Sequence, residues 1–101
     1  MKLLPLGSVV YLKEGRIPLM LVMRRPVVNL LNGTYYFDYA AVDQIIGLEP
    51  DRAVYFNHED ISEIVFEGYI SDKENRIQEA MQEWIISHPE IKKGKISQEK
   101  V

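Results

Sequence analysis

Short apolar runs separated by turn residues fill the first two thirds of the chain and predict strands. Residues 8–12 and 19–23 are apolar and are joined by a polar turn at 13–16, so we expect an antiparallel hairpin. A further apolar run at 27–31 ends at Asn32-Gly33, a dipeptide typical of tight turns between strands. This spacing predicts a sheet built from consecutive, antiparallel strands.

The clearest single strand is expected at 34–42, where aromatic and polar side chains alternate. The face predicted to lie in the core carries Tyr35, Phe37 and Tyr39, and the outward face carries Tyr36, Asp38 and Ala40. A loop is expected at 43–51, because Pro50 disfavours a helix through Glu49. Two more strands are predicted at 54–56 and 61–66.

One helix is predicted near the C-terminus. It begins at Ser71, which with Glu74 three residues later forms a capping box, and it ends near His88 because Pro89 follows. Its apolar residues recur at helical spacing: Ile77, Ala80, Met81, Trp84 and Ile85. Residues 89–101 are rich in lysine and lack periodicity, so we expect a flexible tail there and a single domain over 1–88.

These elements predict an α+β fold. We expect a small antiparallel β-sheet, or a curled barrel-like sheet, of about five strands with one C-terminal amphipathic helix. A chain of 101 residues with 47% hydrophobic residues can form one such core without disulfides, and it has no cysteine.

Charge and hydropathy narrow the function classes. The net charge of −3 makes nucleic acid an unexpected partner, and no apolar stretch is long enough to span a membrane. We therefore expect a cytoplasmic protein.

The densest group of chemically active side chains is Asn57-His58-Glu59-Asp60. One interpretation is a metal or acid–base site, for which His58 needs partners such as Asp38 or Glu67 from other strands. The interpretation we favour is a structural corner in which Asn57 caps a short helical turn, because four consecutive residues cannot all point inward.

Other catalytic patterns are missing from the sequence. No serine lies in a nucleophile-elbow motif and the glycines form no phosphate-binding loop. Arg24-Arg25 is interpreted as the solvated end of a hairpin. We therefore predict no catalytic, cofactor-binding or metal-binding residues and no enzymatic activity.

Aromatic and methionine side chains offer a different kind of site. Met81, Trp84 and Ile85 fit either core packing or a groove for a partner, and Tyr36 is predicted to point outward. These four residues are our candidates for partner binding. The structural group comprises the candidate caps and turn residues Asn57, His58, Glu59, Asp60, Ser71 and Glu74.

Several segments together resemble the domain of unknown function 4176 family, a group of small proteins from Gram-positive bacteria. The similar segments are residues 4–12, Tyr39, Gly47-Leu48, residues 56–61 and residues 65–69, within about 3–86. Members are often encoded beside type VII secretion genes and LXG-domain toxins. The resemblance implies an accessory role as an adaptor or chaperone that binds such a toxin or a secretion component.

Two alternatives stay open. One is an immunity protein that neutralises a toxin, and the other, in a different class, is a small metal-dependent hydrolase centred on His58 and Glu59. The sequence leaves the identity of the partner and the oligomeric state undetermined.

Overall fold

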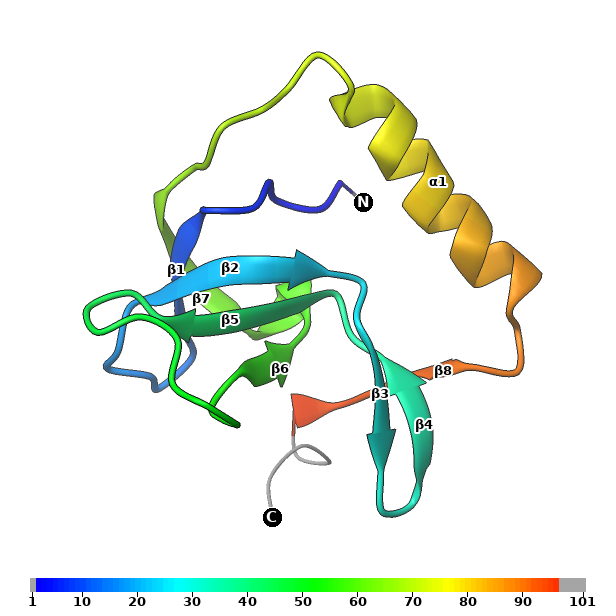
Figure 1. Ribbon diagram of the computed structural model, residues 1–101, viewed down its shortest axis with the longest axis horizontal. Helices are drawn as coiled ribbons and strands as arrows, with labels where there is room; N and C mark the ends of the chain where they lie inside the picture. The colour runs from blue at the N-terminus through cyan, green and yellow to red at the C-terminus, as the bar shows by residue number, and fades with distance from the viewer. Residues whose placement is uncertain (1, 97–101) are drawn as a thin grey trace.

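The computed structural model describes residues 2–96 and contains a five-stranded antiparallel sheet (Figure 1). The strands lie in the order β6-β5-β2-β1-β7. Their bounds are β1 Val9–Leu12, β2 Leu19–Arg24, β5 Tyr39–Asp43, β6 Val54–Phe56 and β7 Ile61–Phe66. The predicted hairpin is confirmed, since β1 pairs antiparallel with β2.

A second, three-stranded sheet extends from the first. It consists of β3 Val27–Leu30, β4 Gly33–Tyr36 and β8 Lys92–Lys93, in the order β3-β4-β8. The α+β class is confirmed, but the sheet does not close into a barrel. The apolar runs are divided between two open sheets, and within residues 2–96 no strand pairing joins the two end strands of the larger sheet.

The predicted continuous strand at 34–42 is wrong, because the chain leaves one sheet and enters the other at Phe37-Asp38. At Phe37-Asp38 the backbone forms hydrogen bonds with the turn between β2 and β3 instead of with an adjacent strand. The Phe37 N–H donates to the Pro26 carbonyl, and the Asp38 carbonyl accepts from the Arg25 N–H. Phe37 and Tyr39 are buried as expected, and so is Asp38, which we had placed outward.

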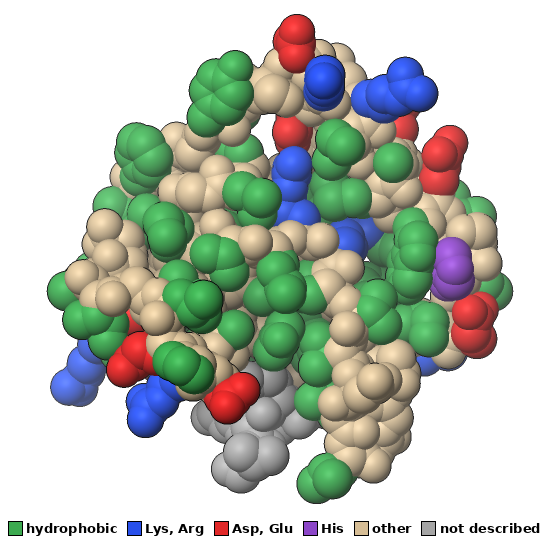
Figure 2. Space-filling model, viewed as in Figure 1, with side chains coloured by type: hydrophobic (Ala, Val, Ile, Leu, Met, Phe, Trp, Pro, Cys, Tyr) green, Lys and Arg blue, Asp and Glu red, His purple; other side chains and the backbone are tan. Residues whose placement is uncertain are grey.

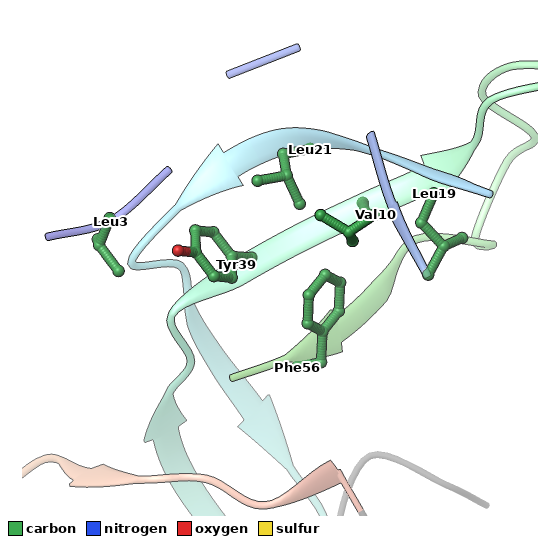
Figure 3. Packing of buried hydrophobic residues seen from close by; sticks show 7 residues of the cluster. Leu3, Val10, Leu19, Leu21, Tyr39 and Phe56 are labelled. Atoms are coloured by element: carbon green, nitrogen blue, oxygen red, sulfur yellow. The ribbon is translucent and has the colours of Figure 1, made fainter. Parts of the chain in front are cut away.

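The core lies on one face of the five-stranded sheet. Val10 from β1, Leu21 from β2 and Phe56 from β6 converge on Tyr39, and Leu3 from the N-terminal segment closes the cluster (Figure 3). The Tyr39 and Phe56 ring centroids lie 5.7 Å apart in a tilted arrangement. The N-terminal segment thus covers one side of the core.

The helix α1, Glu74–Ser87, stands off from the sheet (Figure 1). It starts three residues later than predicted. The Ser71 hydroxyl accepts from the Lys73 N–H in a preceding turn, and the Glu74 carboxylate bonds to Arg24 and Gln78 instead of capping. Within residues 2–96, no helix is both long and apolar enough to cross a membrane.

Part of the C-terminal segment, for which we predicted a flexible tail from residue 89, forms a short strand. Lys92 and Lys93 form β8 beside Tyr35 and Tyr36, and the Gly94 N–H donates to the Tyr36 carbonyl. A side chain at Gly94 would overlap the buried Phe37 ring, so glycine allows this close approach. The part of the predicted tail at 97–101 lies outside the described residues.

Candidate functional site: a buried polar corner and the groove beside α1

The Asp38 carboxylate is the centre of the polar cluster. It is 1% exposed and lies 3.3 Å from Arg25 Nε and 3.3 Å from Lys93 Nζ. It also accepts a hydrogen bond of 2.9 Å from the His58 backbone N–H. A buried carboxylate needs such partners, because burial of an unpaired charge is very costly.

The two cations differ in how they reach Asp38. Arg25 has φ of 56°, a left-handed conformation rare for a residue with a side chain, and its Nε is not aligned for a hydrogen bond. Burial by itself lowers the pKa of Lys93, but the carboxylates of Asp38 and Glu59 raise it above its usual value. Lys93 is therefore charged at neutral pH and fixes the C-terminal segment on the corner.

Asn57 joins the same corner through its side chain. Its Oδ1 accepts from the Asp38 N–H at 3.0 Å, and its amide donates to the Gly94 carbonyl at 2.7 Å. The predicted short helical turn is present as a 3₁₀ helix over His58–Asp60. The Asp60 carboxylate accepts from the Asn57 N–H at 2.8 Å, so Asp60 supplies a capping bond to this turn.

The His58 ring points to Tyr39 and lies 2.9 Å from its hydroxyl. Burial, opposed by the Leu4 N–H bond, raises the pKa of Tyr39 to about 12, so the hydroxyl keeps its proton. The Tyr39 oxygen thus takes part in two hydrogen bonds: it accepts one from the Leu4 N–H and shares the other with His58 Nδ1, in a direction set by the His58 tautomer.

His58 and Glu59 point to different partners. Glu59 is 62% exposed on its side chain and pairs with Lys93 at 3.2 Å. In the described part of the chain, no three His, Cys, Asp or Glu residues are grouped so that they could hold a metal ion. We considered Asp38 as a metal-binding partner of His58. The Asp38 carboxylate accepts a hydrogen bond from the His58 backbone N–H and not from the His58 ring.

A groove of about 320 Å³ lies between α1 and the turn that connects β2 to β3. Its lining consists of Arg24, Arg25, Val27, Ile77, Ala80, Met81 and Trp84. Figure 2 shows Lys and Arg side chains within a hollow beside the helix, with apolar side chains around it. We call this surface the α1 groove.

The apolar stripe of α1 is only partly used in packing. No residue of the helix is buried, although Met81 packs against the core cluster. Trp84 is half-buried and stacks on His88 with ring centroids 4.1 Å apart. One residue of the apolar stripe, Met81, thus attaches the helix to the core, and the stripe also forms an accessible wall of the groove.

The candidate partner-binding residues fall in different places. Met81 and Trp84 line the groove, whereas Ile85 is half-buried outside its lining. Tyr36 is also half-buried, with the Arg25 guanidinium carbon 5.7 Å from its ring centre.

The opposite wall of the groove was missed from the sequence. Arg24 and Arg25, interpreted as solvated, have side chains only 14% and 11% exposed. Arg24 pairs with Glu74 at 2.9 Å and Arg25 with Asp38. The one available signal was the position of Arg25 directly before Pro26, since the residue before a proline has a restricted backbone and often lies in an extended or turn segment.

These features define an α+β module with a partly apolar groove and a polar corner whose side chains are engaged internally. A family model, Domain of unknown function (DUF4176), matches residues 3–77. The chain belongs to this family. The match covers the five-stranded sheet and the strands β3 and β4 of the second sheet, and it ends in the first turn of α1. No curated protein and no solved structure matches the chain.

Proposed function

We propose that this protein is a non-enzymatic binding protein that takes up a segment of another protein in the α1 groove. The observation that carries the proposal is the amphipathic helix that presents Ile77, Ala80 and Trp84 to a groove instead of burying them. Partly exposed apolar and aromatic side chains in a concave surface are typical of interaction sites.

The chemistry of the groove favours an amphipathic partner. The apolar wall belongs to α1, and the two arginines opposite are already neutralised by Glu74 and Asp38. Neither arginine has a free charge that demands an acidic ligand. The apolar face of a partner helix therefore fits best, as in other helix-in-groove complexes.

The family resemblance suggests who that partner is. We infer that it is an LXG-type toxin or a component of type VII secretion, and that this protein serves in the cytoplasm as its adaptor or chaperone. The internal contacts of His58 and Glu59 support a binding role over a metal-dependent hydrolase, because their side chains do not converge.

Co-purification tests the proposal and separates it from immunity. The tagged protein is expressed with the N-terminal region of a neighbouring LXG toxin or with its C-terminal toxic domain. An adaptor retains the N-terminal region. Retention of the toxic domain alone would identify an immunity protein, and retention of neither would contradict the assignment to this toxin class.

A further inference from the structure

The strand β7 forms one end of the five-stranded sheet. In the order β6-β5-β2-β1-β7 it pairs only with β1, and no other strand within residues 2–96 pairs with its far edge. Ile61 is half-buried and the other five residues of β7 are exposed. An edge strand of this kind presents backbone donors and acceptors that an added strand can satisfy.

Apolar side chains accompany this edge on both faces of the sheet. Opposed residues of an antiparallel pair share a face, so Ile64 lies on the core face with Val10 and Phe66 lies on the outer face with Val9. Ile64 is 48% exposed, Val65 52% and Phe66 60%. Val65 and Phe66 also line a hollow with Tyr11 and Met20.

Acidic residues bracket these three apolar positions. Glu63 and Glu67 are exposed on either side of Ile64, Val65 and Phe66. The whole stretch 59–72 carries five acidic residues, Glu59, Asp60, Glu63, Glu67 and Asp72, and no lysine or arginine. Glu59 is paired with Lys93 and Asp60 bonds to the Asn57 backbone, which leaves Glu63 and Glu67 to set the charge of the edge itself.

The negative charge along the edge of β7 indicates which kind of strand can pair with it. A second copy of the chain would bring the same glutamates to the new seam, where like charges repel. A strand with basic residues would be attracted by the same edge.

We propose that the edge of β7 is a strand-addition site for an extended, basic segment of a partner protein. The segment carries a Lys or Arg residue at each end of a short run of β-branched residues, so that the basic residues lie near Glu63 and Glu67 and the β-branched residues lie along Ile64, Val65 and Phe66. This site shares no residue with the α1 groove, so it stands whether or not the proposed function is correct.

The probe is a fluorescein-labelled peptide, Thr-Lys-Val-Val-Val-Lys-Thr, with a counterpart in which glutamate replaces both lysines. Fluorescence anisotropy should show that the basic peptide binds about ten-fold more tightly than the acidic one at low salt. Glu63→Lys should weaken binding of the basic peptide about five-fold. Glu49→Lys, the same charge change in an exposed loop, should leave it unchanged.

N-methylation distinguishes strand addition from side-chain binding. One peptide is methylated on one alternate set of backbone nitrogens and a second peptide on the other set. Because only one set faces β7, one methylated peptide should lose binding and the other should keep it.

Equal behaviour of the two methylated peptides would overturn the proposal. So would equal affinities for the basic and acidic peptides. Sedimentation that shows a concentration-dependent dimer disrupted by Val65→Pro would also overturn it, because the occupant would then be a second copy.

Discussion

Asn57 connects three segments that are distant in the sequence. Its side-chain Oδ1 accepts from the Asp38 N–H, its side-chain amide donates to the Gly94 carbonyl, and its backbone N–H donates to the Asp60 carboxylate. The side chain is buried, with 2% of the residue exposed. It therefore contributes more than the local capping that the sequence suggested.

Asn57→Ala should lower the free energy of unfolding by about 2–4 kcal/mol, because it leaves two buried backbone groups without partners. A helix cap alone is worth about 0.5–2 kcal/mol. Urea denaturation measures the change. Asn29→Ala, at an exposed position on β3, should cost under about 0.5 kcal/mol. A loss no larger at Asn57 than at Asn29 would contradict the connecting role.

For the polar corner around Asp38, the sequence predicted the contacts between neighbouring residues and missed the contacts between residues distant in the chain. The turn at His58–Asp60 could be recognised from neighbouring residues. The approach of Lys93 to Asp38 could not, because it depends on how β8 returns to β4. Nothing in the residues around Lys93 indicates that this lysine, in a lysine-rich segment, pairs with a buried carboxylate.

At the scale of elements, α1 is attached to the rest of the molecule largely by polar bonds. Arg24 pairs with Glu74, and the Gln78 side chain bonds both the N–H and the carbonyl of Leu3. Periodicity predicted the helix because it depends only on spacing along the chain. It could not predict how much of the stripe is buried, since that depends on where the N-terminal segment lies.

The attachment of α1 should weaken in acid. The Arg24 guanidinium, with help from Gln78, holds the pKa of Glu74 below its ordinary value of 4.5. A lowered pKa in the folded state means that the unfolded chain takes up the proton first. The stabilisation is thus complete above the unfolded pKa and is lost as the pH falls through the folded one.

Glu74→Gln should consequently destabilise the protein at pH 7 and have a smaller effect at pH 3. Urea denaturation at both pH values, followed by fluorescence of Trp84, the only tryptophan, measures the difference. Glu79→Gln, at an exposed position on the same helix, should show no such pH dependence. An effect of Glu74→Gln that is equal at both pH values would contradict the ion pair.

At the scale of the whole molecule, three regions differ in role. The polar corner around Asp38 joins the two sheets and the C-terminal segment, whereas we propose that the α1 groove takes up a partner segment and that the edge of β7 accepts a strand. The class of fold followed from strand and helix patterns. The division into two sheets did not, because it depends on the bend at Phe37-Asp38 and its contacts with Arg25 and Asn57.

The most direct test of the groove as the binding site is a calorimetric titration of Ala80→Glu with the partner region retained in co-purification. Ala80 is exposed and lines the groove, so the new carboxylate should weaken binding at least about ten-fold while the free energy of unfolding changes by less than about 0.5 kcal/mol. Gln82→Glu adds the same charge outside the groove lining and should bind as the unaltered protein does. Unchanged affinity in Ala80→Glu would show that the partner does not bind in the α1 groove.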